Sequence, residues 1–280
     1  MKKTYWIQAV TSLHSGTGRG LGYIDNPIAR ESVTNWPYVP ASSIKGVLRD
    51  YFEDNAETKD LVNKAFGAGG ENNSAGALVF TDAKIVCLPV RSLYGTFAWC
   101  CSTVSLNRIK RDLLLAGIKS FDNIPNIEKQ KISVTSNSEL KYEKKVYLED
   151  LDLDVQDQAE TETDKIAQFL ANKIFTDDIQ KEIFQKRFAI VGEEVFNFLC
   201  ETGTEVIAHN RIKDDTKVTD TGALWYEETL PPETILFGFV WQQEFCKTDL
   251  NCFCNSKLYL QLGGKSSVGK GQIICNFVAE

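Results

Sequence analysis

The sequence predicts an α+β fold, with strands at both ends of the chain and helices inserted between them. Apolar or alternating stretches near the two ends have the character of core strands: residues 5–13, 235–244, 258–262 and 272–278. Between them, Ile44, Val47 and Leu48 recur at the spacing of one helix face, so this segment is expected to pack inward as a helix. Strands at the ends with helices between them are typical of the α+β class.

The first fifty residues contain a loop and a helix with cations on its outer side. Residues 16–22 are rich in glycine and predict the loop. Ser42 or Ser43 is a good N-cap for the helix that follows. Lys45 and Arg49 lie four residues apart on another face than the apolar one, so they can act together.

The middle of the chain is read from apolar spacing and turn residues. The elements expected there are a loop at 67–76, strands at 77–80 and 84–88, an apolar stretch at 96–101, a helix at 105–115, a helical segment at 165–184 with a break near 176–178, a strand at 188–191 and a short helix at 193–200. In the helix at 105–115, Arg108, Lys110 and Arg111 are expected on the exposed face.

A long hairpin is expected before the last strands. Residues 204–212 and 223–228 flank a polar tip at 213–217. No linker rich in proline or serine interrupts the chain, so we expect one domain over residues 1–280. That domain includes a less regular inserted subregion at about 106–186.

Composition restricts the class of protein. The chain has 280 residues and 43% hydrophobic side chains, which is enough to bury a large core. No apolar run approaches the length of a membrane span and no signal region follows the charged start, so a cytoplasmic protein is expected. The eight cysteines include no CxxC pair, which favours reduced structural thiols over a zinc site.

The net charge of −7 argues against a free-standing nucleic-acid binder, although local fields decide binding. The first fifty residues carry several cations and few acids: Lys2, Lys3, Arg19, Arg30, Lys45 and Arg49. The acid excess lies elsewhere, notably over residues 149–164. That run predicts a solvated face or a mobile loop; the alternative is an edge that docks on a basic neighbour.

Residues 264–270 resemble a phosphate-binding P-loop, but the chemistry does not fit. The position after Lys270 should hold Ser or Thr to bind magnesium, and it holds Gly271. The segment also leads into a strand, whereas a P-loop opens a helix. We therefore interpret it as a glycine-rich loop whose amides, with Lys265 and Lys270, face RNA phosphates, against the alternative of a plain hairpin turn.

Asp25 lies in an Asp-Asn-Pro sequence, which is strong turn chemistry. The same carboxylate, placed among cations, could accept a proton or hold a divalent ion. The residues alone leave both interpretations open. Of the two histidines, His14 lies in the glycine loop and His209 just before the hairpin tip, and either could be structural.

Several segments, taken in order along the chain, resemble the RAMP superfamily of CRISPR proteins, and more narrowly the backbone subunit of type III-B (Cmr) effector complexes. They are residues 25–31, 37–46, 76–83, 88–93, 211–213, 222–228, 263–265 and 269–271. The resemblance implies an RRM-like, ferredoxin-like core with large insertions. It also implies that the hairpin is a thumb that enters the guide–target duplex.

The resemblance also implies functional residues. Asp25 matches the aspartate that cleaves target RNA in the family, with divalent metal, Mg or Mn, as the cofactor; His14, Glu227 and Glu228 are minor candidates for the active centre. The residues expected to bind RNA are Arg19, Arg30, Ser42, Ser43, Lys45, Arg49, Gly264, Lys265 and Lys270. The cut would proceed by attack of the ribose 2′-hydroxyl and leave a cyclic phosphate.

The partners implied are guide CRISPR RNA, complementary target RNA, further copies of the chain stacked head-to-tail and other Cmr subunits. Two alternatives stay open: a non-catalytic RNA scaffold in which Asp25 is structural, or the equivalent type III-A backbone subunit. A stand-alone RNA-processing enzyme is disfavoured because histidine is scarce.

Overall fold

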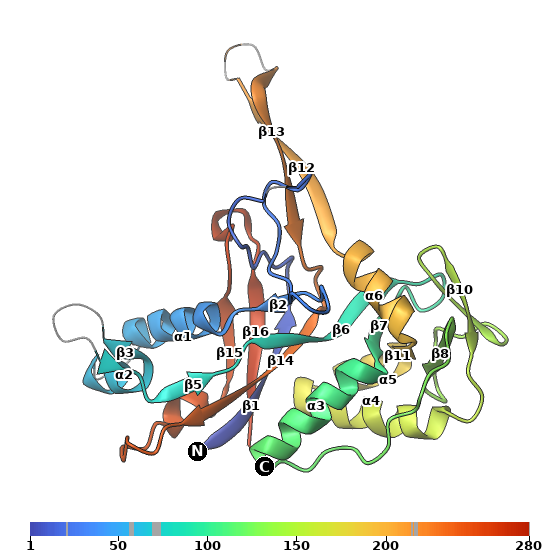
Figure 1. The fold of residues 1–280 in the computed structure, drawn as a ribbon, viewed down its shortest axis with the longest axis horizontal. Coiled ribbons are helices and arrows are strands. Elements are labelled where there is room, and N and C mark those ends of the chain that lie inside the picture. The colour runs from blue at the N-terminus through green and yellow to red at the C-terminus, as the bar shows by residue number, and fades with distance from the viewer. Residues whose placement is uncertain (21, 56–58, 69–73, 214, 216–217, 280) are drawn as a thin grey trace.

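A mixed sheet of twelve strands runs through the protein (Figure 1), which is described here from a computed structural model covering residues 1–20, 22–55, 59–68, 74–213, 215 and 218–279. The main path of the sheet is β15 (Lys257–Gln261), β16 (Gln272–Val278), β1 (Lys2–Ala9), β14 (Ile235–Gln242), β6 (Ala83–Arg91), β7 (Phe97–Ser102), β11 (Phe188–Val191), β8 (Lys131–Val134), β10 (Leu151–Val155) and β9 (Lys145–Leu148). Two short strands complete it: β2 (Tyr38–Val39) pairs with β6, and β5 (Leu78–Phe80) pairs with β14.

Helices cover both faces of this sheet and create two apolar cores. One core holds apolar side chains of α1 (Ala41–Asn55), α2 (Lys59–Phe66) and α6 (Glu193–Thr202), and the other those of α3 (Thr103–Ala116), α4 (Glu160–Ile174) and α5 (Asp178–Arg187). On β1, Tyr5 and Ile7 enter the first core and Trp6 enters the second. A strand buried on both faces lacks clean alternation, which explains the imperfect pattern of its sequence.

The α+β prediction is confirmed, and most predicted elements are present with shifted ends. The first strand, for example, ends at Ala9 rather than at residue 13. The N-cap prediction was wrong, because α1 begins at Ala41 and the two serines lie in its first turn. The Pro40 carbonyl accepts the N–H groups of Ser43 and Ile44, and Asp82 Oδ1 accepts the N–H of Ala41 at 2.8 Å. A carboxylate from a distant loop therefore supplies the cap.

The inserted subregion contains three strands that the sequence did not predict, β8, β10 and β9. The acidic run at 149–164 was expected as a solvated face or a mobile loop, and its first part is β10. There Asp152 and Asp154 are exposed while Leu153 is buried, so the acids alternate with the apolar residue. The loop expected at 67–76 also contains two paired strands, β3 (Gly67–Ala68) and β4 (Ser74–Ala75); residues 69–73 lie outside the described residues.

The predicted hairpin is present and projects from the body of the protein (Figure 1). It consists of β12 (Glu205–Ile212) and β13 (Thr219–Thr229), which form a sheet of their own. Much of its apolar surface is exposed, including Val206, Ile207 and Leu224. In the predicted tip, residues 214, 216 and 217 lie outside the described residues. No helix in the described part of the chain is both long and apolar enough to cross a membrane.

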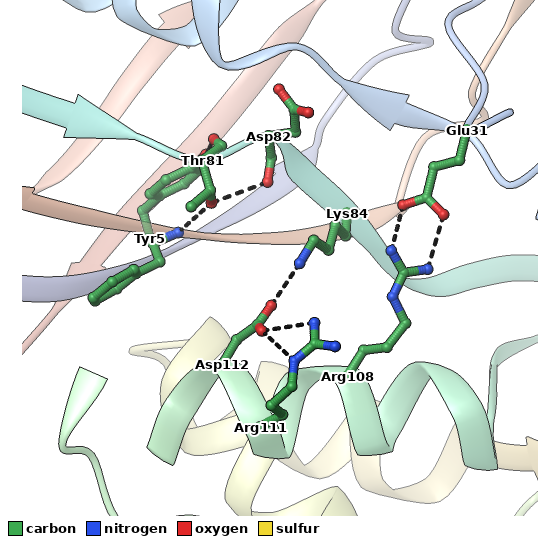
Figure 2. A network of polar contacts seen from close by, with 9 residues as sticks. Tyr5, Glu31, Thr81, Asp82, Lys84, Arg108, Arg111 and Asp112 are labelled. Carbon is green, nitrogen blue, oxygen red and sulfur yellow. Dashed lines mark hydrogen bonds and ion pairs between the residues drawn. The ribbon is translucent and has the colours of Figure 1, made fainter. Parts of the chain in front are cut away.

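Ion pairs fasten the segment after Asp25 to helix α3 (Figure 2). Glu31 receives a bidentate contact from Arg108, and Asp112 on the same helix accepts from Lys84 of β6 at 2.7 Å. Arg108 was expected on exposed surface, but it is three-quarters buried in this pair; Arg111 is exposed as predicted. The guanidinium of Arg108 also lies 5.5 Å from the ring centre of Trp36. Arg108 thus contacts the end of the Asp25 segment at both Glu31 and Trp36.

Candidate active site

A polar cavity of about 580 Å³ lies where the loop around Asp25 meets the base of the hairpin. Its walls carry three cations from three separate parts of the chain: Arg19, Arg211 and Lys265. Two carboxylates, Asp25 and Asp220, line the same space. Three cations beside the Asp25 carboxylate can neutralise phosphate charge, so the arrangement suits a phosphodiester.

Backbone contacts with β13 fix the position of Asp25. Its Oδ2 accepts the N–H of Tyr226 at 2.8 Å, and its carbonyl accepts the N–H of Gly20 at 2.8 Å. The next residue, Asn26, accepts the N–H of Glu228 and donates to the carbonyl of Tyr226, forming a short parallel bridge with Glu227. The Asp-Asn-Pro turn is therefore attached to the hairpin strand as an extra strand-like segment, which holds the carboxylate against the cavity.

Glu227 is buried beneath the cavity and is paired with Lys265. Lys265 Nζ lies 2.5 Å from Glu227 Oε1, and the indole N–H of Trp225 donates to the same oxygen at 2.6 Å. Burial alone would raise the pKa of Glu227, but the hydrogen bonds from Lys265 and Trp225 and the charges of His209 and Lys265 bring that pKa below its ordinary value. Glu227 is thus a carboxylate at neutral pH, where it orients Lys265 and does not serve as a proton donor.

Glu228 lies under the other side of the same loop. Its carboxylate accepts the N–H of Ile28 at 3.0 Å, the hydroxyl of Thr204 at 2.9 Å and a guanidinium N–H of Arg30 at 2.5 Å. Arg30 also donates to the carbonyls of Asn35 and Cys200. The structure thus places Arg30 and Glu228 at a second cavity of about 380 Å³, which shares no lining residue with the cavity around Asp25.

His14 connects the glycine-rich C-terminal loop to Glu228. Its ring Nδ1 is 2.8 Å from the Glu228 carbonyl oxygen, and its own carbonyl accepts the N–H of Gly264 at 3.0 Å. Gly263 has a φ of +80°, and a Cβ there would lie 2.3 Å from the His14 oxygen, so this close approach requires glycine. His14 is buried and makes a positioning contact in the described structure.

The remaining predicted RNA-binding residues lie elsewhere. On α1, Lys45 Nζ donates to the Leu78 carbonyl at 2.8 Å, and Arg49 contacts Glu53 and the Gly67 carbonyl. Burial lowers the pKa of Lys45. Ser42 is exposed in the first turn of α1 and Ser43 half-buried beside it. Lys270 Nζ is buried without a hydrogen-bond partner among the residues that the structure describes.

Some residues of this site were not among the predicted ones. Arg211, Asp220 and Trp225 line the cavity because the hairpin brings them over Asp25, nearly 200 positions away in sequence. Arg211 lies in a segment that resembles the family, which is the signal that could have identified it. Thr204, which contacts Glu228 at the second cavity, has no comparable signal, because a single threonine before a strand is common.

The side chains around Asp25 determine whether a divalent metal ion could be held in this cavity. No group of three or more His, Cys, Asp or Glu side chains suited to a metal is gathered in the described part of the chain. The carboxylates that line the cavity are those of Asp25 and Asp220. Mg²⁺ in phosphoryl-transfer sites is commonly held by one or two carboxylates together with phosphates of the substrate, so these residues fit such an ion only in combination with RNA.

Comparison with known proteins identifies the family. A model of the RAMP superfamily matches residues 6–274. The chain is 34% identical over 275 residues to the CRISPR system Cmr endoribonuclease Cmr4 of Pyrococcus furiosus, an alignment that covers 95% of this chain and 92% of that protein.

Solved structures agree with this match. The crystal structure of oligomeric Cmr4 from Pyrococcus furiosus has a TM-score of 0.80 at 28% identity, covering 99% of this chain and 98% of that one. A chain in the cryo-EM structure of the type III-B Cmr-beta complex bound to cognate target RNA has a TM-score of 0.78 at 22% identity, covering 99% and 97% respectively, which is a likeness of fold. With a shared fold, a family match over nearly its whole length and a relative at 34% identity, the chain belongs to the RAMP superfamily of CRISPR proteins.

Proposed function

We propose that this chain is the repeating backbone subunit of a type III-B antiviral complex, where it binds guide CRISPR RNA and cuts guide-paired target RNA. The observation that carries the proposal is the placement of Asp25 on a cavity wall with Arg19, Arg211 and Lys265, at the base of the projecting hairpin. Its relative from Pyrococcus furiosus is an endoribonuclease of the Cmr system.

The chemistry that suits this site is attack by the ribose 2′-hydroxyl. Asp25 accepts the hydroxyl proton, the 2′-oxygen bonds to the adjacent phosphorus, and the 5′-oxygen of the next nucleotide leaves with a proton from solvent. The products are a 2′,3′-cyclic phosphate and a 5′-hydroxyl. Arg19, Arg211 and Lys265 stabilise the additional negative charge on the phosphorane oxygens.

A divalent ion is the second possible role for Asp25. Mg or Mn would be held by the Asp25 carboxylate, with Asp220 nearby, and by phosphate oxygens of the substrate. When bound, it would supply positive charge at the scissile phosphate. The proton-accepting and metal-holding roles both require an ionised Asp25, so both are abolished by the same substitution.

The proposed partners follow from the same assignment. The crystallised relative from Pyrococcus furiosus is oligomeric. We propose that copies of this chain stack head-to-tail along the guide, through an interface between unlike faces, which generates an open filament. Phosphate contacts carry no sequence information, which suits a scaffold that must accept any guide. The eight free thiols support a cytoplasmic location. We further propose that residues 1–280 form one domain, since strands from both ends of the chain pair in the main sheet.

Cleavage by assembled complexes that carry Asp25→Asn tests the proposal. Asn preserves the size and turn chemistry of the residue and removes its charge. We expect target RNA to bind normally and the cleavage rate to fall on the order of a hundredfold to ten-thousandfold. Wild-type products should end in a cyclic phosphate. Cleavage by the Asn variant at the wild-type rate would identify the chain as a scaffold in which Asp25 is a turn residue.

A further inference from the structure

A third cavity lies beside the apolar core formed by α3, α4 and α5. It is a cavity of about 250 Å³ between α5, β7 and the turn that precedes β14. Its aromatic walls are Phe97, Trp99 and Phe175, and its polar walls include Gln8, Arg187 and Glu233. It shares no lining residue with the cavity around Asp25. Apolar walls with a few convergent polar groups are typical of small-ligand sites.

The aromatic walls are fixed in position. The rings of Phe97 and Trp99 are 4.5 Å apart at 72°, and those of Trp99 and Phe175 are 6.2 Å apart at 63°. The indole N–H of Trp99 donates to the Glu233 carbonyl at 2.9 Å, which prevents the ring from turning. A space of this size beside flat rings accepts one planar ring system, since aromatic side chains stack on nucleobases and other heterocycles.

The described residues do not provide acceptors for all the N–H groups of Arg187. Its guanidinium lies 5.5 Å from the centre of the Phe97 ring, and its Nε is buried with no hydrogen-bond partner among the described residues. Its nearest carboxylate contact is with Glu139, at 3.6 Å. Buried polar groups are nearly always paired, so this guanidinium has donor capacity that the described residues leave unused. Because Arg187 lines the cavity, a ligand there can supply an acceptor.

Glu233 occupies a backbone position that is unfavourable for it. Its φ is +71°, in the left-handed region that glycine and asparagine adopt more readily. Its N–H donates to the Ala9 carbonyl at 2.7 Å, which holds the turn in that conformation. Its carboxyl accepts from the Gln8 side chain at 2.7 Å, and burial raises its pKa. Strained backbone positions of this kind cluster at ligand sites, and this one holds a carboxyl group on the wall of the cavity.

We propose that this cavity binds a single nucleobase with a carbonyl next to a ring N–H, as in hypoxanthine, guanine or uracil. Arg187 donates to the base carbonyl, Glu233 accepts the ring N–H, and the base packs beside Trp99. An adenine-type edge fits poorly, because it presents an amino group to the arginine. The base comes from a free nucleotide or from an unpaired position of bound RNA.

Calorimetric titration of the purified full-length chain with inosine, uridine and adenosine tests this site. Nucleosides have no phosphate, so they do not compete for the cations around Asp25. Inosine and adenosine differ in the base edge that would face Arg187 and Glu233. We expect inosine and uridine to bind at least tenfold more tightly than adenosine. A ratio of this size corresponds to the free energy of about one lost hydrogen bond to a charged group. Equal binding of the three, or no binding of any, would overturn the proposal.

Two variants separate recognition from folding. Glu233→Gly relieves the left-handed strain, so its thermal midpoint should not fall, while inosine affinity should fall tenfold or more. Arg187→Met retains the packing on Phe97 and removes the donor, with the same expected loss. A Glu233→Gly protein that keeps full inosine affinity would show that Glu233 does not read the base. Asp25→Asn should bind inosine normally, which keeps this test independent of the cleavage proposal.

The source of the base is decided with assembled complexes that contain 4-thiouridine in the guide or target strand. Ultraviolet cross-links to the peptide spanning residues 97–99 identify an RNA base as the ligand. Binding of inosine with no such cross-link identifies a free nucleoside or nucleotide. The absence of both nucleoside binding and cross-linking would refute the site.

Discussion

Both terminal nitrogens of Arg108, on helix α3, donate hydrogen bonds to the carboxylate of Glu31 (Figure 2). Nη1 donates to Oε2 at 2.9 Å and Nη2 to Oε1 at 2.5 Å. Glu31 also accepts the hydroxyl of Thr34 at 2.6 Å. The pair joins the segment that begins at Asp25 to a helix on the other side of the sheet. Planar two-point contacts of this kind fix the relative orientation of the two side chains and also strengthen their interaction.

We predict that Glu31→Gln destabilises the fold by about 1–2 kcal/mol at pH 7, because the ion pair is largely buried and hydrogen-bonded twice. Denaturant unfolding of Glu31→Gln, Arg108→Met and the double variant measures the coupling. Arg108→Lys is the matched control: it keeps the charge and loses the two-point geometry. A double variant equal to the sum of the single ones would show that the pair contributes nothing.

The same pair should give stability a defined pH dependence. Burial alone would raise the pKa of Glu31, but the hydrogen bonds from Arg108 and Thr34 and the nearby positive charges lower it from its ordinary value of 4.5. A lowered pKa in the folded state stabilises the fold above the unfolded-state pKa, and this contribution is lost as pH falls through the folded-state pKa. The gap in unfolding free energy between wild type and Glu31→Gln should therefore be constant above about pH 5 and shrink toward pH 3.

Glu227 offers a test of the active site that does not touch Asp25. Glu227→Gln removes the charge that holds Lys265 Nζ, so Lys265 no longer points at a fixed place in the cavity. We expect cleavage by assembled complexes to slow roughly tenfold to a hundredfold, as for the loss of one oriented charge-stabilising group, while target RNA affinity does not fall. Loss of RNA binding without loss of cleavage rate would contradict this role.

The pH profile gives a second readout for the same variant. Since the pKa of Glu227 is held below its ordinary value of 4.5, its carboxylate is ionised throughout the range in which RNA cleavage is measured. Wild type and Glu227→Gln should consequently differ in rate but share the shape of their profiles between pH 5.5 and 8. A limb of the wild-type profile that disappears in Glu227→Gln would make Glu227 the proton donor instead.

The sequence predicts local features of this fold better than distant contacts. The apolar stripe of α1 and the break between α4 and α5 follow from spacing alone, and the hairpin follows from two strands around a polar tip. The cap of α1 was missed because Asp82, about forty residues later, supplies it. Strand β10 was missed because its exposed aspartates hide the alternation with Leu153.

At the candidate site, too, individual residues could be predicted from the sequence but contacts between distant residues could not. Asp25, Arg19 and Lys265 could be named from the sequence and the family resemblance, and all three line one cavity. The ion pair between Arg30 and Glu228 could not be predicted, since the two residues meet only through the folding of the hairpin onto the loop. Residues 198 positions apart leave no local pattern.

Lys45 and Arg49 of α1 form the proposed guide-binding surface on the body of the protein. Lys45 donates to the carbonyl of Leu78, and Arg49 donates to the carbonyl of Gly67 and to the carboxylate of Glu53. A phosphate oxygen can replace the two carbonyls as acceptor. We expect Lys45→Ala with Arg49→Ala to weaken guide binding and to lower the salt slope by roughly 1–2, at about 0.7 per lost phosphate contact. Filter binding at several salt concentrations provides the measurement.

The control pair removes the same charge from a different face. Lys181 and Lys186 lie on α5, where they pair with Asp178 and Glu182. Lys181→Ala with Lys186→Ala should leave both guide affinity and the salt slope unchanged. An equal fall in the two double variants would mean that net charge, and not the α1 surface, governs binding.

Assembly is the last property that the proposal predicts. The chain is acidic overall but carries cations near its N-terminus, so unlike faces of successive copies can attract each other. Addition of guide RNA should convert the protein into larger oligomers whose mass increases in steps of one subunit, as measured by light scattering with size-exclusion chromatography. Asp25→Asn should assemble as the wild type does, because its carboxylate is proposed to act on target RNA alone. A complex that stays at one protein per guide, whatever the length of the guide, would refute head-to-tail stacking and leave cleavage at Asp25 to be judged by its own test.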